Sequence, residues 1–330
     1  MIDNIDILLA TYNGEKYLKE QIDSILNQTY KNIRLIISDD CSTDDTKNIL
    51  NKYEKKDNRI KVFYQEKNLG YIKNFEFLLT KVESKFYMLS DQDDVWLPQK
   101  VEKSLEKIQK ENADMVFSDL EVVDSDLKTV YNSFNDFMLL TRKINKYIDS
   151  YKLNYLYNCV TGCTIISKKQ FIKYILPIPS IHKEVAHDYW MALMVSLNGK
   201  MSYMPERYIK YRQHGNNQIG TDKISHKFKK LEQVRNLFIN VKLGIFNTYV
   251  ENNSRFPKEL QKINCDALEY YKMIKEKKCF NFKNWNVFHK LYKDETFVYY
   301  MQNFCIMNLP LIGRFLFKVR YIMLKIRGKR

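Results

Sequence analysis

The stretch Ile5-Asp6-Ile7-Leu8-Leu9-Ala10-Thr11-Tyr12-Asn13-Gly14 begins as an apolar strand and ends in a polar turn. A helix is predicted directly after this turn, because Leu18, Ile22, Ile25 and Leu26 recur at helical spacing. The beginning of the chain therefore forms one unit of strand, turn and helix.

The same order of elements is repeated further along the chain. Strands are predicted at residues 33–37 and 60–64, each before a polar turn and a helix, and further strands at 86–89, 115–119 and 160–167. Alternating strands and helices are typical of a mostly parallel sheet flanked by helices, with the turns after the strands gathered at one edge. The predicted fold class is α/β, with a Rossmann-like sheet.

Three carboxylates follow the strand at 86–89 within four residues: Asp91, Asp93 and Asp94. They cannot all remain ionised side by side unless a divalent ion, a basic partner or a raised pKa relieves the repulsion. Oxygen ligands favour Mg²⁺ or Mn²⁺, and open α/β sheets bind ligands at this edge. The alternative is a solvated turn that caps a helix beginning near Pro98.

Five motifs in order resemble the family 2 glycosyltransferases, which have the GT-A fold: Thr11-Tyr12-Asn13, residues 39–44, Asn68-Leu69-Gly70, residues 91–96 with an Asp-x-Asp, and His187-Asp188-Tyr189-Trp190. The block Tyr211-Arg212-Gln213-His214-Gly215-Asn216-Asn217 is similar to that of bacterial rhamnosyltransferase-like members. The resemblance implies a nucleoside-diphosphate sugar as donor, either dTDP-rhamnose or a UDP-sugar.

The resemblance also implies which residues bind the donor. Asp40 accepts a hydrogen bond from the base, with its neighbour Asp39 as the alternative, and Asp91 holds the ribose. The other residues implied in donor binding are Thr11, Tyr12, Asn13, Asn68 and Gly70.

The same resemblance assigns the chemistry. Asp93 binds the Mn²⁺ or Mg²⁺ that bridges the two phosphates, with Asp94 in support. Asp188 is the base that takes the proton of the acceptor hydroxyl, which implies a single displacement with inversion. As a bare residue, Asp188 is equally typical of a helix N-cap. His214 is either a third metal ligand or an ordinary surface residue, and Arg212 and Gln213 are the next candidates.

Charge divides the chain. From His226 onward, 22 Lys and Arg stand against 8 Asp and Glu, so nearly all of the net charge of +15 lies there. We predict a catalytic GT-A domain at residues 1–225 and a basic helical region at 226–330, with helices at 228–243, 259–278 and 295–307. Residues 309–330 form a cationic amphipathic stripe, which favours either an anionic membrane surface or contact with the catalytic domain or a second subunit of a homo-oligomer.

The remaining features bear on location. No run approaches the roughly 18 apolar residues of a spanning helix, and the first strand leaves no room for a signal peptide. The six cysteines are dispersed, which favours reduced thiols. We predict a cytoplasmic protein that is peripheral on the inner face of the plasma membrane if the basic stripe binds lipid.

The sequence thus predicts a metal-dependent, inverting glycosyltransferase that acts on a hydroxyl of a cell-surface glycan, a glycolipid or a protein-linked glycan. One alternative is a basic protein with a vestigial nucleotide site that binds membrane or nucleic acid. Nucleic acid is not the expected partner, because the basic residues lie among apolar ones on a helix. The other alternative is a nucleotidyltransferase, against which the lack of a Gly- and Lys-rich triphosphate loop argues.

Overall fold

The computed structural model describes residues 3–180, 184–214, 231–276, 282–295 and 300. The chain forms two compact units, Met1–Ser180 with Ala186–Gln218, and Ile181–Val185 with Ile219–Arg330. The boundary predicted between residues 225 and 226 lies outside the described residues, so the predicted domains of 1–225 and 226–330 stay a prediction.

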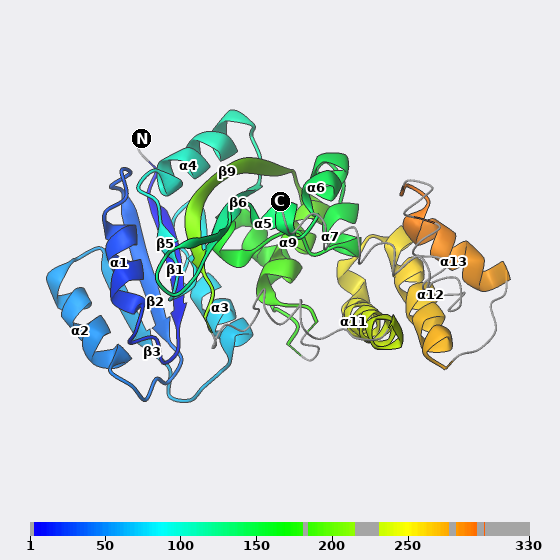
Figure 1. The fold of residues 1–330 in the computed structure, drawn as a ribbon, viewed down its shortest axis with the longest axis horizontal. Coiled ribbons are helices and arrows are strands. Elements are labelled where there is room, and N and C mark those ends of the chain that lie inside the picture. The colour runs from blue at the N-terminus through cyan, green and yellow to red at the C-terminus, as the bar shows by residue number, and fades with distance from the viewer. Residues whose placement is uncertain (1–2, 181–183, 215–230, 277–281, 296–299, 301–330) are drawn as a thin grey trace. The chain divides into compact units, whose positions relative to one another are not determined.

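The first unit is built on a nine-stranded sheet with the order β3-β2-β1-β4-β8-β6-β9-β5, in which β7 pairs with β6. Its first half alternates strands and helices, as predicted (Figure 1): β1 (Ile5–Thr11), α1 (Leu18–Leu26), β2 (Ile33–Asp39), α2 (Thr46–Lys56), β3 (Ile60–Tyr64), α3 (Tyr71–Leu79) and β4 (Phe86–Ser90). These strands pair in parallel, in the order β3-β2-β1-β4. The carboxyl ends of β1, β2 and β4 therefore bring Thr11, Asp39 and Ser90 to one edge.

The second half of the unit adds shorter strands and helices: β5 (Val95–Trp96), α4 (Lys100–Lys110), β6 (Met115–Val123), β7 (Thr129–Tyr131), α5 (Phe134–Phe137), α6 (Thr141–Tyr147), α7 (Lys152–Leu156), η1 (Gly162–Thr164), β8 (Ile166–Lys168), η2 (Lys169–Phe171), α8 (Ile172–Ile175), α9 (His187–Asn198) and β9 (Met201–Arg212). Strand β8 runs antiparallel between β4 and β6, and β9 pairs in parallel with β6 and antiparallel with β5. The sheet is mostly parallel at one side and mixed at the other.

One strand prediction is wrong in its first part. Within residues 160–167, Gly162–Thr164 form a 3-10 turn, and only the segment from Ile166 pairs with the sheet. The cause is local, because the hydroxyl of Thr164 donates to the carbonyl of Thr161 at 2.6 Å and the backbone follows the same turn. This turn lies against the start of α9 and shapes the site described below.

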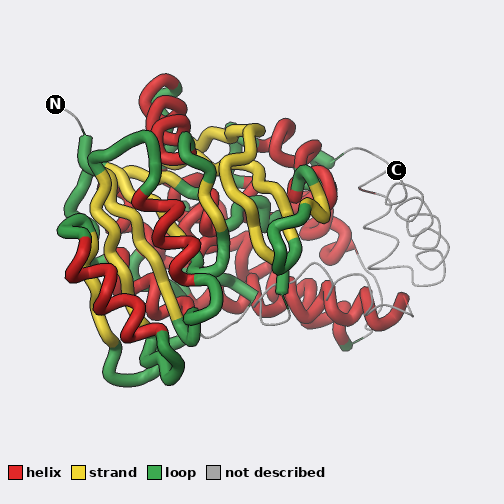
Figure 2. The backbone as a smooth tube through the Cα atoms, turned by 60° about the vertical axis from the view of Figure 1, so that its left-hand side comes forward, coloured by secondary structure: helices red, strands yellow, loops and turns green. Residues whose placement is uncertain are grey.

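Helices cover both faces of the parallel half of the sheet (Figure 2). One apolar cluster joins side chains of β1, β2 and β4 to those of α1, α2 and α4, including Ile7, Ile22 and Val101. Helix α3 contacts β1 and β2, and Leu8, which points to the opposite side from Ile7, is also fully buried. A strand that is apolar on both faces is typical of a parallel sheet between helices.

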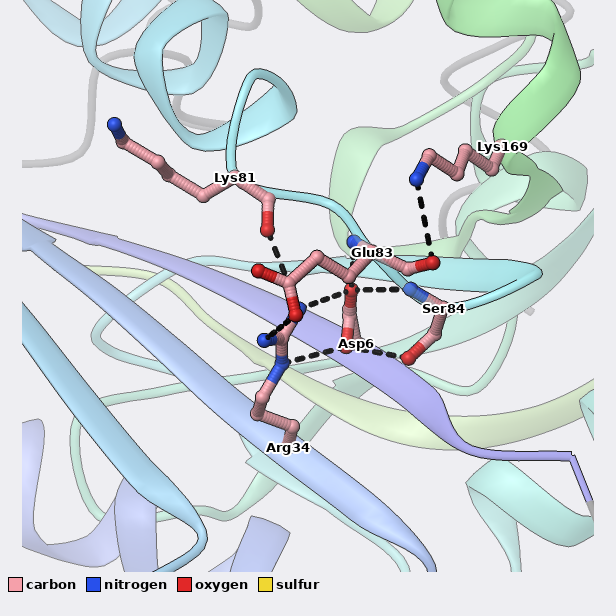
Figure 3. Close-up of polar contacts among 6 residues, drawn as sticks. All are labelled: Asp6, Arg34, Lys81, Glu83, Ser84 and Lys169. Carbon is pink, nitrogen blue, oxygen red and sulfur yellow. Dashed lines mark hydrogen bonds and ion pairs between the residues drawn. The ribbon is translucent and has the colours of Figure 1, made fainter.

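A buried acid anchors the edge of the sheet opposite the polar turns. Asp6 of β1 is fully buried, and the guanidinium of Arg34 donates to both of its oxygens, at 3.0 and 2.9 Å. The hydroxyl and amide of Ser84 and the amide of Glu83 also donate to Asp6 (Figure 3). Burial acts to raise the pKa of Asp6, but these hydrogen bonds outweigh it and hold the pKa below its usual value.

The second unit is helical. Its described elements are α11 (Leu231–Glu251), η3 (Asn253–Arg255), α12 (Lys258–Lys275) and α13 (Phe282–Tyr292). The predicted helices at 228–243 and 259–278 are confirmed within the described residues, whereas α13 was not predicted. Nearly all of the predicted helix at 295–307 and the stripe at 309–330 lie outside the described residues. Among the described helices, none has the length and apolar character that crossing a bilayer requires.

Candidate functional site

The turns after β1 and β2 are joined by hydrogen bonds. The amide of Asn13 donates to the hydroxyl of Ser42 at 2.8 Å, and the side-chain oxygen of Asn13 accepts from the amide of Thr43 at 2.9 Å. Asn13 adopts a φ of 49°, a left-handed conformation that Asn tolerates better than most residues. The predicted donor residues at 11–13 and 39–40 are therefore brought together at one edge of the sheet.

Asp39 and Asp40 each hold a loop. Asp39 accepts hydrogen bonds from the amide and the hydroxyl of Ser42, so its carboxylate serves the turn after β2. Asp40 accepts from the amides of Leu69 and Gly70, at 2.7 and 2.9 Å. The structure thus places Asp40 beside the loop that contains Asn68 and Gly70, and the side-chain amide of Asn68 donates to the carbonyl of Asp40 at 3.3 Å.

Gln92, which was not among the predicted site residues, connects the first turn to the acid run. Its side-chain oxygen accepts from the hydroxyl of Thr11 at 2.6 Å and from the amide of Tyr12 at 2.9 Å, and its side-chain nitrogen donates to the carbonyl of Tyr12 at 3.1 Å. A Cβ on Gly14 would lie 2.4 Å from that oxygen, so a larger residue at position 14 would have to displace the Gln92 side chain. Tyr12 is left 46% exposed, with its ring available for contact with a planar ligand.

The three carboxylates of the acid run are not equivalent. Desolvation, together with the charges of Asp93 and Asp188, raises the pKa of Asp91 to about 7. Asp94 is fully buried and accepts a hydrogen bond from the backbone amide of Arg212 at 3.2 Å. Burial and the charges of Asp93 and Asp91 raise the pKa of Asp94 well above its usual value. Raised pKa values therefore relieve part of the repulsion that the sequence predicts.

Lys100 supplies a basic partner that the sequence analysis missed. It is the first residue of α4, is 1% exposed, and has its ammonium 3.0 Å from the centre of the Trp96 ring. Burial lowers the pKa of Lys100 well below its usual value, against the charges of Cys163, Asp94 and Asp91. Its only sequence signal is its position in the first turn of the helix after the acids.

Asp91, Asp94 and Cys163 form a group whose ligand atoms lie within 4.8 Å of one another. Burial, followed by the charges of Asp94 and Asp91, raises the pKa of the Cys163 thiol well above its usual value. A protonated thiol is a poor metal ligand, and Lys100 already places an amine near these acids. This group fits an internal cluster of acids and an amine better than a metal site.

Asp93 and His214 meet, although they are 121 residues apart. The carboxylate Oδ2 of Asp93 lies 2.9 Å from Nε2 of His214, so the two side chains form a hydrogen bond when no ion is bound. Two neighbouring ligands of an octahedral ion at about 2.1 Å lie about 3 Å apart, so this spacing fits a shared divalent ion. Carboxylate oxygen suits Mg²⁺ and Mn²⁺, and the softer imidazole nitrogen favours Mn²⁺ of the two.

Arg212 and Tyr17 support this pair. Tyr17 stacks on His214 with 5.0 Å between ring centres, and the guanidinium of Arg212 lies 4.5 Å from the Tyr17 ring. Arg212 also donates to the carbonyl of Asp93 at 2.9 Å and to that of Ser125 at 2.7 Å, and it pairs with Glu20. The guanidinium thus holds the backbone of the acid run. Neither Tyr17 nor Glu20 belongs to any of the motifs recognised in the sequence.

Asp188 is the second residue of α9, whose N-cap is Ala186. The simple N-cap interpretation is therefore wrong for Asp188. Its carboxylate accepts from the amide of Tyr189 at 2.7 Å and from the amide of Gly162, in the 3-10 turn, at 2.9 Å. The charge of Asp188 contributes to the raised pKa values of Asp91 and, after burial, of Tyr71. Asp188 therefore lies close enough to Asp91 for its charge to influence that carboxyl group.

Comparison with known proteins identifies the family of the chain. The model of the family described as "Glycosyl transferase family 2" matches residues 6–175. An uncharacterized glycosyltransferase of Haemophilus influenzae is 28% identical, over 73% of this chain and 76% of its own length. The dTDP-rhamnosyl transferase RfbG of Shigella flexneri is 29% identical, over 69% of this chain and 79% of its own length.

Two solved structures share the fold. Staphylococcus aureus TarS 1-349 in complex with UDP-GlcNAc has a TM-score of 0.56 at 20% identity, covering 92% of this chain and 81% of that one. The mannosyltransferase PcManGT of Pyrobaculum calidifontis, in complex with GDP-Man and Mn²⁺, has a TM-score of 0.55 at 10% identity, covering 99% and 87%. The chain belongs to glycosyl transferase family 2 and is a glycosyltransferase with the GT-A fold.

Proposed function

We propose that this enzyme is a metal-dependent, inverting glycosyltransferase that moves a sugar from a nucleoside diphosphate to a hydroxyl of a cell-surface glycan or glycolipid. The observation that carries the proposal is the contact of 2.9 Å between Asp93 and His214, in the unit that also contains Asp91 and Asp188. Two candidate ligands that are distant in sequence meet beside two further carboxylates.

In this proposal Asp93 and His214 hold Mn²⁺ or Mg²⁺, which when bound stabilises the negative charge that develops on the diphosphate leaving group. Arg212 fixes the backbone of Asp93, and Tyr17 fixes the plane of the His214 ring. The two ligand side chains are thus oriented by protein contacts before any ion binds, as preorganised sites require.

Asp188 is proposed to receive the proton of the acceptor hydroxyl. The amides of Gly162 and Tyr189 each occupy one lone pair of the carboxylate, and a carboxylate has about four such positions. Asp188 can therefore accept a further proton while its orientation stays fixed. With one base and no nucleophilic side chain assigned, we infer direct displacement with inversion and no covalent intermediate.

The donor is proposed to lie along the turns at Thr11–Asn13 and Asp39–Asp40, with Asn68, Gly70 and Asp91 completing its site. Two relatives support two donor classes, one being named a dTDP-rhamnosyl transferase and another, WfgD of Escherichia coli, being named for UDP-Glc and a diphosphoundecaprenol acceptor. We therefore rank dTDP-rhamnose first and UDP-sugars second.

A binding experiment and a transfer experiment test the proposal together. Thermal shift with UDP, dTDP, UDP-sugars and dTDP-rhamnose, each with and without Mn²⁺, is expected to show stabilisation by a nucleotide that depends on the ion. Asp93→Ala should abolish that dependence, whereas Asp188→Asn should bind the donor but lose transfer. Full transfer by Asp188→Asn would exclude Asp188 as the base.

We also propose that residues 309–330 bring the enzyme to an anionic membrane surface, where a lipid-linked acceptor would lie. The support is compositional, since this segment contains no acidic residue. A contact with a second subunit through the same segment is the competing proposal, and its test is given below with the charge of the whole chain.

A further inference from the structure

His187 is a buried polar side chain at the start of α9, directly before the proposed base. It is 7% exposed, and neither of its ring nitrogens has a hydrogen-bond partner among the described residues. A buried polar group without a partner costs about 1–3 kcal/mol, and a phenyl ring would fill the same space without that cost. The presence of histidine at this position is therefore better explained if a group of the substrate forms a hydrogen bond with the imidazole.

The contacts of His187 fix its ring plane. The ring stacks on Phe75 of α3, with centres 4.1 Å apart and planes at 16°, and meets the Tyr71 ring edge-on at 5.9 Å. A Cβ on Gly162 would lie 3.1 Å from Nε2 of His187, so the glycine leaves space at that edge of the imidazole. The amide of the same glycine donates to Asp188. The edge of the imidazole that carries Nε2 therefore meets the turn that holds the proposed base.

We propose that His187 binds a hydroxyl group of the donor sugar, and that the side chain of Tyr71 covers the imidazole until the sugar enters. This inference rests on the proposed function, in which Asp188 lies near the anomeric carbon. A neutral imidazole offers one donor and one acceptor nitrogen, and a sugar hydroxyl can pair with either. Burial lowers the pKa of His187, which agrees with a neutral ring.

Two features indicate that the hydroxyl bound by His187 belongs to the donor sugar rather than to the acceptor glycan. His187 packs on α3, and that helix begins at Tyr71, directly after Gly70, whose amide is held by Asp40 in the proposed donor site. Of the two aromatic neighbours, Phe75 is 2% exposed and fixed in the core, whereas Tyr71 is 37% exposed and has solvent into which it can turn. The path to His187 therefore opens from the donor side.

The test compares nucleotides with and without the sugar. Isothermal titration calorimetry in Mn²⁺ would measure UDP, UDP-GlcNAc, dTDP and dTDP-rhamnose on the wild type, His187→Phe and His187→Gln. Loss of one hydrogen bond is expected to weaken the sugar nucleotide that the wild type prefers by about tenfold in His187→Phe. The matching diphosphate should bind unchanged, and His187→Gln, which keeps a donor and an acceptor, should recover part of the loss.

The matched control is His289→Phe, since His289 of α13 also stacks on an aromatic ring, that of Trp285, at 5.0 Å. It should leave all four affinities unchanged. Equal affinities of wild type and His187→Phe for the sugar nucleotide, or an equal loss for the diphosphate, would overturn the inference while the proposed function stands. A wild type that binds none of the four nucleotides would overturn the proposed function itself, and with it the role of His187.

Discussion

Lys100 is an amine that the fold places out of water beside two carboxylates. Moving an ammonium group into the protein interior is costly unless opposite charges are near. The groups whose charges would favour protonation of Lys100 are Cys163, Asp94 and Asp91. The Trp96 ring, 3.0 Å from the ammonium, adds an electrostatic contact with its π face. The acids and the amine therefore depend on one another.

Removing Lys100 should expose this dependence. Lys100→Met keeps most of the volume but leaves the buried acids without their basic partner, so we expect a loss of about 3 kcal/mol in the free energy of unfolding, measured with urea. Lys100→Met combined with Asp94→Asn should recover part of that loss. If the two changes are simply additive in this double-mutant cycle, Lys100 and Asp94 are not coupled.

Gly70 tests the backbone of the donor loop. Its φ is 79° and its ψ is 155°, a backbone conformation that essentially only glycine adopts. A Cβ there would meet nothing within 4 Å, so Gly70→Ala should cost about 1–3 kcal/mol of unfolding free energy through backbone strain alone. Gly70→Asn should cost about as much, because Asn tolerates the left-handed helical conformation but not this one with positive φ and extended ψ. A much smaller loss for Gly70→Asn than for Gly70→Ala would show that strain is not the cause.

Two features of the first unit were not predicted from the sequence. The turn at Gly162–Thr164 had the composition of a strand, and Asp6 lies inside an apolar strand that gave no sign of a buried acid. The turn is set by the local hydrogen bond from the Thr164 hydroxyl to the Thr161 carbonyl and also contacts Asp188 of α9. The contacts that decide the burial of Asp6 come from distant segments, through Arg34 and Ser84. Periodicity predicts which face of an element is apolar. It does not predict which distant polar group will pair with a polar residue that lies on that buried face.

The Asp6 anchor makes a prediction about pH at the level of the sheet. The pKa of Asp6 is lowered in the folded protein, below the value of about 3.9 expected in the unfolded chain. Its contribution to stability is therefore complete above pH 4 and is lost as the pH falls through the folded pKa. Arg34→Met should reduce the unfolding free energy by about 3 kcal/mol at pH 7, and by less in denaturation at pH 3.

Arg59→Met is the matched control for Arg34→Met. The two arginine side chains are similarly exposed, at 27% and 28%, but Arg59 pairs with Asp57, two residues away, and ties no strands together. Its loss should be within about 1 kcal/mol. A loss as large as that of Arg34→Met would show that strand anchoring is not what the Asp6 contact provides.

At the scale of the whole chain, nearly all of the net positive charge lies in the residues from His226 onward. The basic residues after His226 are proposed to attract an anionic surface, and each is worth about 1 kcal/mol near such a membrane. Neutralising Arg314, Lys318 and Lys325 to Gln should therefore weaken co-sedimentation with phosphatidylglycerol vesicles by about two orders of magnitude at low salt.

The control for this experiment is a triple change of three exposed lysines in α12, Lys262, Lys272 and Lys275, to Gln. It removes the same charge from another helix of the basic region and should have a smaller effect on vesicle binding. Vesicle binding that survives the first triple change, with a loss of dimer in light scattering, would favour the contact with a second subunit.

The predictable part of the molecule is the part encoded locally. The strands β1 to β4, the helices between them and the edge at which their turns meet follow from apolar spacing and turn residues, and the family follows from five short motifs in order. Gln92, Tyr17 and Lys100 had no predicted role in the site, and Arg212 was predicted only as a further candidate ligand, yet Gln92, Tyr17 and Arg212 contact predicted site residues. Their contributions arise from contacts between segments up to 192 residues apart, such as Arg212 with Glu20.

The hydrogen bonds of Gln92 have a practical consequence for engineering donor preference. The side-chain amide of Gln92 forms hydrogen bonds with the hydroxyl of Thr11 and with both backbone groups of Tyr12. The first turn and the acid run are therefore expected to depend on each other for their conformation. Grafting residues 11–14 from a relative with another base preference should succeed only when its counterpart of Gln92 is transplanted with them.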